Sequence, residues 1–130
     1  MAVNPFPLVD VWLRYAILFH YDYLGKPNHY DILLEIVEGE GSEQLALDKI
    51  ETTEVLRSLQ AAIVIDPKEL IRRRYLTYEG PMSGNRGFVK RVDSGTYKLT
   101  ESDSLEFRGS LLNGRYHFSE DATHLLILRK

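Results

Sequence analysis

Short β-prone runs, separated by turn-forming residues, recur along nearly the whole chain. Residues 30–37 (YDILLEIV) alternate with a period of two, which places every second residue from Tyr30 onward on one apolar side and is typical of a half-buried strand. Residues 14–21 (RYAILFHY) are also apolar and β-prone. The sequence GKPN at 25–28 indicates a loop between these two runs, so they are well placed to form a hairpin.

The rest of the chain has the same character. Further strands are expected over residues 45–50, 74–78, 88–92, 96–99, 105–111, 115–119 and 125–128. Turns or loops are expected at 38–42, 79–87 and 93–95, and the Asn-Gly pair at 113–114 is a hairpin signal. One short helix is predicted over 53–60 and another after the Asp-Pro pair at 66–67, because Asp favours the cap and Pro the first helical position. This pattern predicts a single, mainly β domain over residues 1–130, a small barrel or sandwich of short antiparallel strands with one or two short helices.

The composition excludes several classes of protein. There is no cysteine among the 130 residues, which excludes disulfides, thiolate zinc sites and a cysteine nucleophile, and fits a reducing compartment. No stretch approaches the roughly 20 apolar residues that a membrane-spanning helix needs, and the first residues do not have the pattern of a signal peptide. We therefore expect a cytoplasmic protein with no membrane partner.

The charge is unevenly distributed. The net charge of −3 argues against nonspecific binding of nucleic acid over the whole surface. Residues 68–98, however, hold eight Lys or Arg against three acidic residues, a local charge of +5. Such a segment on an acidic body favours a phosphate-bearing ligand, and the alternative is a set of solvated strand faces.

Two histidines and an aspartate form a candidate metal site. His29 and Asp31 would project from the same face of a strand, and a hairpin across the 22–28 loop would bring His20 opposite or nearly opposite to them. Two imidazoles and one carboxylate suit a divalent transition metal such as Mn or Zn, with positions left for water or phosphate. In the structural alternative, Asp31 accepts a hydrogen bond from His29 or from a loop amide. His117 and His124 have no nearby acidic partner and are interpreted as structural.

Three motifs resemble one family. HYDILLE at 29–35 resembles the HYDFRLE signature of the 3′-phosphoesterase domain at the N-terminus of bacterial DNA ligase D, and His20 is similar to the first histidine of that family's QKHDARRLHYD segment. YLTYEGPMSGNRG at 75–87, continued by VKRVDSGTY at 89–97, resembles its Y-x-x-FEG-x-IP-x-G-x-YG-x-G-x-V-x-x-WD-x-GTY motif. LLNGRY at 111–116 and LLILRK at 125–130 resemble its L-x-G-RY hairpin and its LLIKRK end. The motifs keep their order, residues 40–70 match poorly, and the chain looks like a divergent stand-alone member.

The resemblance implies both a fold and a function. It implies a small closed or partly open β-barrel and a Mn²⁺-dependent hydrolase, a phosphoesterase that processes the 3′ ends of DNA or RNA in repair. His20, His29 and Asp31 would hold Mn²⁺, with Zn²⁺ or no metal as alternatives, and Tyr75 would help to bind the phosphate. The partners would be nucleic-acid 3′ ends, with DNA ligase or other end-joining proteins as further candidates.

The chain departs from the family pattern at three points. Leu33 stands where the family has a phosphate-contacting arginine, and Ile71 stands where it has a second histidine. The separation of His20 and His29 is nine residues where the family has six, which predicts a shift of His20 relative to the hairpin. Arg72 and Arg74, on one face of an expected strand, are candidates to replace the lost charge. Two alternatives follow: a non-catalytic module that binds nucleic-acid ends or proteins, and a β-barrel with an unrelated partner.

Overall fold

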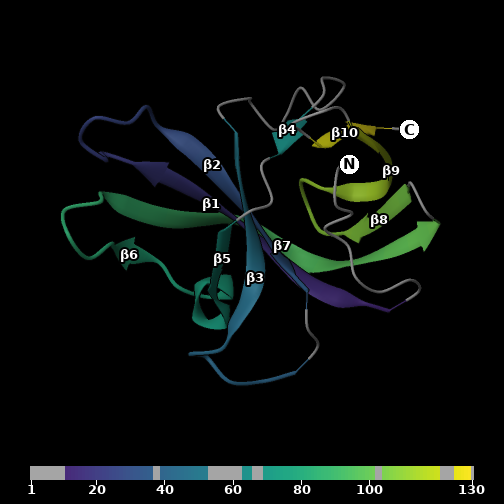
Figure 1. Cartoon of the computed structure of the whole chain (residues 1–130), viewed down its shortest axis with the longest axis horizontal. Coiled ribbons are helices and arrows are strands. Elements are labelled where there is room, and N and C mark those ends of the chain that lie inside the picture. Colours follow the sequence, from purple (N-terminus) through teal and green to yellow (C-terminus); the bar gives the residue numbers. More distant parts are fainter. Residues whose placement is uncertain are drawn as a thin grey trace.

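The computed structural model describes residues 11–36, 39–52, 63–65, 69–101, 104–120 and 125–129. The helix expected over 53–60 lies outside these residues. The described elements are β1 (Leu13–Tyr21), β2 (His29–Glu35), β3 (Leu45–Thr52), β4 (Ile63–Ile65), β5 (Glu69–Arg72), the 3-10 turn η2 (Arg73–Leu76), β6 (Gly80–Pro81), β7 (Phe88–Glu101), β8 (Ser104–Arg108), β9 (Asn113–Glu120) and β10 (Leu125–Arg129) (Figure 1). None of the helical residues in these ranges forms a segment long and apolar enough to cross a membrane.

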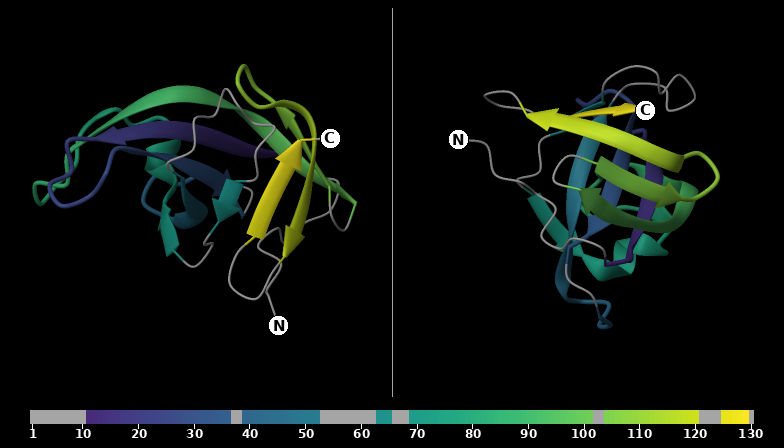
Figure 2. Two further views of the ribbon diagram at one scale, coloured as in Figure 1. Left: turned by 90° about the horizontal axis from the view of Figure 1, so that it is seen from above. Right: turned by 90° about the vertical axis from the view of Figure 1, so that its right-hand side faces the viewer.

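All strands of the described residues belong to one antiparallel sheet. Its order is β4-β10-β9-β8-β7-β1-β2-β3-β5, and β6 adds to β7 outside this path. The sheet curls strongly, with β7 arching over the molecule and β8, β9 and β10 turning back at one end (Figure 2). The edge strand β4 comes into contact with β3, but no strand pairing joins the two ends of the path within the described residues. The prediction of a mainly β fold of antiparallel strands is confirmed. The sheet is open, so the closed-barrel alternative is wrong for the described residues.

Both faces of the central strands are buried, which explains why β1 and β2 are apolar on both sides. Alternate residues of β1 point to opposite faces, so Tyr15 and Ile17 enter one cluster while Ala16 and Leu18 enter the other. The large cluster comprises Leu13, Tyr15, Ile17, Ile32, Leu34, Tyr97, Leu99, Leu105, Phe107, Leu112 and Tyr116. The small cluster comprises Ala16, Leu18, Leu33, Leu47, Leu76 and Val89, with Ile71, Tyr75, Tyr78 and Met82 packed against it.

Two predictions around residues 66–78 were wrong. The helix expected after the Asp-Pro pair is replaced, from Glu69 onward, by strand β5, and the strand expected over 74–78 is replaced by the 3-10 turn η2. The turn is fixed by contacts distant in sequence: the amides of Arg73 and Arg74 donate to the carbonyls of Gln44 and Ser42, at 2.8 and 2.9 Å. These tertiary bonds override the local β propensity on which the prediction was based.

The turn expected at 93–95 was also wrong, because β7 runs through it without interruption. The Asp93 carboxylate instead accepts hydrogen bonds from the amides of Ser110, Leu111 and Leu112, at 3.0 to 3.1 Å. The Asp93 side chain therefore shapes the connection between β8 and β9, residues 109–112. The Asn-Gly pair, which was expected to form the hairpin turn, instead begins strand β9. An acidic side chain that accepts several amides is a common way to build a tight loop.

Candidate metal centre

His20, His29 and Asp31 converge at one end of the β1–β2 hairpin. In the register of this hairpin His20 lies directly opposite His29, and Leu18 lies opposite Asp31. The three side chains point to the face of the small cluster, and these residues are only 3–5% exposed. One ligand atom from each lies within 4.8 Å of the other two. The structure therefore brings together the three metal ligands that the sequence predicted.

The long loop does not displace His20, contrary to the expectation from its spacing. Asp22 adopts a left-handed conformation, with φ of 57°, and its amide donates to Asn28 Oδ1 at 3.2 Å. A turn then closes through Lys26 N and the Tyr23 carbonyl, at 3.0 Å. The additional residues form this loop outside the ladder, so the strands remain in the register that pairs the two histidines.

Each histidine is anchored through one ring nitrogen by a main-chain carbonyl. His29 Nδ1 lies 2.9 Å from the Pro27 carbonyl oxygen, and His20 Nε2 lies 2.5 Å from the Arg86 carbonyl oxygen. A carbonyl oxygen only accepts hydrogen bonds, so both of these nitrogens carry the proton. In a neutral imidazole the second nitrogen then has a lone pair, which would make His29 Nε2 and His20 Nδ1 the atoms available to a metal. In the structure His20 Nδ1 is within hydrogen-bond distance of Asp31 Oδ2, at 3.1 Å.

The two ligand nitrogens face the same carboxylate. His29 Nε2 lies 3.1 Å from Asp31 Oδ1, and His20 Nδ1 lies 3.1 Å from Asp31 Oδ2. The buried Asp31 Oδ1 accepts no hydrogen bond of normal geometry from the described part of the chain. Metal bonds of about 2.0–2.2 Å place neighbouring ligand atoms about 3.0–3.4 Å apart. Both nitrogen–oxygen separations, each to a different oxygen of Asp31, lie within this range. The group could thus hold a metal ion, and its donors alone do not decide which one.

Next to this centre the face of the sheet is apolar. Leu33 is the next residue of β2 on the same face as Asp31, and it is fully buried in the small cluster. Ile71 packs against the same cluster. The positions where the resembling family has an arginine and a histidine are therefore occupied by packed hydrocarbon, with no hydrogen-bond donor for a phosphate from either side chain.

The other predicted site residues lie on β5 and η2, toward the far end of the sheet. Tyr75 is half-buried against the small cluster, and its ring meets that of Tyr78 edge-on at 5.7 Å. Arg72 Nε and Arg74 Nη1 bind opposite oxygens of Glu43, each at 3.3 Å. Arg74 also donates to Tyr75 Oη at 3.3 Å, and this hydrogen bond raises the pKa of its guanidinium.

These arginines are well separated from the metal centre. Arg72 pairs with Leu45, beyond the point where β3 passes Glu35. Glu35 is itself four residues from Asp31, or about 13 Å along an extended strand. None of the contacts that the structure gives Arg72 or Arg74 is with His20, His29 or Asp31. Their catalytic roles and that of Tyr75 stay a prediction.

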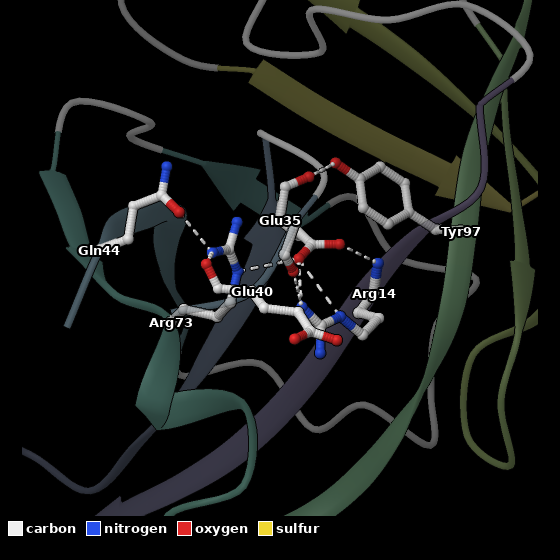
Figure 3. A network of polar contacts seen from close by, with 7 residues as sticks. Arg14, Glu35, Glu40, Gln44, Arg73 and Tyr97 are labelled. Atoms are coloured by element: carbon white, nitrogen blue, oxygen red, sulfur yellow. Dashed lines mark hydrogen bonds and ion pairs between the residues drawn. The ribbon is translucent and has the colours of Figure 1, made fainter. Parts of the chain in front are cut away.

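A buried ion-pair network at this far end was not foreseen. Glu35 Oε2 accepts from Arg73 Nε at 3.1 Å and from Arg14 Nη2 at 2.7 Å (Figure 3). Arg73 Nη1 also donates to Gln44 Oε1 and to the Glu40 carbonyl, at 2.5 and 2.9 Å. The hydrogen bond to Glu35 raises the pKa of Arg14. Because Glu35 and Arg73 are 38 residues apart, no local pattern could have paired them.

Comparisons with known proteins add no further constraint. No family model matches the chain, and no curated protein matches it. The likeness to the ligase D phosphoesterase domain thus rests on the motifs of the sequence. The side chains of His117 and His124 lie outside the described part, so their structural interpretation is untested.

Proposed function

We propose that the protein is a divergent, Mn²⁺-dependent phosphoesterase that acts on the 3′ ends of DNA or RNA. The observation that carries this proposal is the convergence of His20, His29 and Asp31, with one ring nitrogen of each histidine 3.1 Å from the same buried carboxylate. Buried imidazoles whose remote nitrogens donate to main-chain carbonyls are typical of metal ligands. Mn²⁺ is preferred over Zn²⁺ because the family that the motifs resemble uses Mn²⁺.

Two regions of the chain would have different roles, one in binding the metal ion and the other in binding the nucleic acid. A divalent ion at the centre would supply a Lewis acid for a phosphoryl oxygen and would lower the pKa of a bound water. His20, His29 and Asp31 would hold this ion, and their burial would strengthen its electrostatic interaction with a phosphate. The basic segment 68–98, which includes Tyr75, would attract the nucleic acid, and Tyr75 would help to bind phosphate as the resemblance implies.

The test is release of phosphate from a primer–template with a 3′-phosphate, with Mn²⁺ and then with EDTA. We expect release with Mn²⁺, none with EDTA, and a loss of at least about 100-fold in the His29→Ala variant. Glu106→Gln, which removes a carboxylate from β8 on another part of the sheet, is the matched control and should keep the wild-type rate. Release that is unchanged in His29→Ala would contradict the proposal.

The packing of Leu33 favours a second candidate, a non-catalytic module that binds nucleic-acid ends or recruits a ligase or another end-joining protein. This side chain is fully buried where an arginine would contact phosphate, and Ile71 lies in the same cluster. Losing two such polar groups would cost about two to three orders of magnitude each in rate. Fluorescence anisotropy with labelled 3′-phosphate DNA separates the candidates, since a module of this kind binds the end without releasing phosphate.

A further inference from the structure

The loop between β6 and β7, residues 82–87, contacts the metal centre through its main chain. The Arg86 carbonyl oxygen accepts the hydrogen bond of His20 Nε2 at 2.5 Å. The loop is closed by a hydrogen bond from Met82 N to the Gly87 carbonyl at 2.8 Å. Within it, Arg86 Nε and Nη2 donate to the carbonyl and hydroxyl oxygens of Ser83, at 2.7 and 2.9 Å. The loop therefore holds its own shape while it presents one carbonyl to His20.

Gly87 makes this approach possible. Its φ is +77°, a conformation that favours glycine. A Cβ atom added there would lie 2.2 Å from the Tyr21 carbonyl oxygen and 2.8 Å from the backbone of Asp22 and Tyr23. The loop thus packs backbone against backbone on the segment that leaves β1 just after His20. Any side chain at position 87 would force the two segments apart, and the Arg86 carbonyl would move with the loop.

We infer that the Arg86 main chain, placed by Gly87, selects Nδ1 of His20 as its metal-binding atom. In His29 the two ring nitrogens have exchanged roles, because Nδ1 donates to the Pro27 carbonyl and Nε2 faces Asp31. The centre then has one Nδ1 ligand and one Nε2 ligand, fixed by two different loops. This inference rests on the metal-binding part of the proposed function and is independent of phosphate ester hydrolysis.

The expected size of the effect follows from the role of the remote hydrogen bond. Such a bond fixes the tautomer and the orientation of the ring, and its loss typically lowers metal affinity 10- to 100-fold. Arg86 and Gly87 are positioning residues, because they act only through His20. The Arg86 carbonyl makes the contact with His20, and the Arg86 side chain contributes by holding the loop through Ser83.

The first test compares two glycine substitutions in the same loop. Gly87→Ala and Gly84→Ala both place alanine at a positive φ, +77° and +71°, but the Cβ at position 84 would meet only Arg86 Nε, at 4.0 Å. Titration with Zn²⁺ and Mn²⁺ should show affinity about 10- to 100-fold weaker in Gly87→Ala and close to wild type in Gly84→Ala. Equal affinities in folded Gly87→Ala and in wild type would overturn the inference.

The second test needs no variant and so decides the matter if Gly87→Ala does not fold. In the Zn²⁺-loaded wild-type protein, long-range ¹H–¹⁵N spectra should show His20 protonated on Nε2 and coordinated through Nδ1, with the reverse at His29. Coordination of His20 through Nε2 would overturn the inference and leave the proposed function standing. If the wild-type protein binds neither Zn²⁺ nor Mn²⁺, both the metal centre and the inference are refuted.

Discussion

Replacing Arg73 by methionine removes one partner from a buried ion pair and leaves the other in place. Arg73 and Glu35 have side chains 4% and 2% exposed, and their charged atoms are 3.1 Å apart. Methionine keeps much of the volume of arginine but offers no donor. The Glu35 carboxylate would retain contact with Arg14, whose side chain is 48% exposed. Burying a carboxylate with less compensation disfavours the folded state.

The cost is about 3–5 kcal/mol in the free energy of unfolding, the range for removing one partner of a buried pair. A domain of this size has about 5–15 kcal/mol in total, so the shift is large. Arg73 also ties the 39–44 loop to η2 through Gln44 and Glu40, and these bonds would be lost as well. Urea unfolding followed by circular dichroism measures the change directly.

Arg72→Met is the control, because Arg72 makes an exposed ion pair with Glu43 from the adjacent position. It should change the free energy of unfolding by about 0–1 kcal/mol. Adding Glu35→Gln to Arg73→Met removes the stranded charge and should recover part of the loss. If Arg73→Met is as mild as Arg72→Met, the buried network is not a stabilising feature of the fold and the reasoning fails.

Four further predictions concern buried groups. Tyr15→Phe removes the hydroxyl that donates to Asp93 Oδ2 at 2.7 Å and should cost about 1–3 kcal/mol in urea unfolding, and wild-type stability would contradict this. Burial, and then the hydrogen bond to Asp93, raise the pKa of Tyr15. Above about pH 10 the unfolded chain loses this proton while the folded state keeps it, which favours unfolding. The stability of the wild type should therefore decline above about pH 10 more than that of Tyr15→Phe. Gly109→Ala would place a Cβ 1.6 Å from the Tyr15 hydroxyl. The loss of unfolding free energy that it causes should be smaller in the Tyr15→Phe background than in the wild type, and an equal loss in both backgrounds would refute the clash. Leu33→Arg should destabilise the protein by more than about 3 kcal/mol without improving phosphate binding, and a stable variant with tighter binding would show that the apolar packing is dispensable.

The part of the fold that could be predicted from the sequence is the part with strong local signals. The period-two pattern of residues 30–37 and the β-prone run 14–21 predicted strands observed as His29–Glu35 and Leu13–Tyr21. The run 125–128 likewise became Leu125–Arg129. Residues 30–37 alternate with the period of a strand, and the other two segments are short continuous apolar runs, so each signal survives small local preferences.

The errors occurred where one side chain acts over a long distance. The Asp-Ser-Gly sequence at 93–95 is a common turn, yet Asp93 reaches across to the amides of residues 110–112 and the strand continues through it. The run of three arginines at 72–74 gave no reason to expect a 3-10 turn, because that turn is held by Glu35 and by the carbonyls of the 39–44 loop. Single-sequence reasoning does not include such partners.

For the candidate site, spacing identified the ligands but not their support. The face rule placed His29 with Asp31, and the hairpin brought His20 opposite, as expected. The carbonyls of Pro27 and Arg86 could not be foreseen, because any residue has a carbonyl and only the folded backbone shows which one points at a ring. The loop length suggested a shift of His20 that the left-handed Asp22 prevents.

The most direct test of the account is the metal stoichiometry and affinity of the purified protein, by calorimetric titration of the metal-free chain with Mn²⁺ and with Zn²⁺. The account predicts one ion per chain with micromolar or tighter affinity, and a loss of at least 10-fold in Asp31→Asn, which keeps the shape of the side chain but removes its charge. The control Glu106→Gln should bind like wild type. Failure to bind either ion, or equal binding by Asp31→Asn, would show that His20, His29 and Asp31 form a structural hydrogen-bonded cluster and would contradict the central claim.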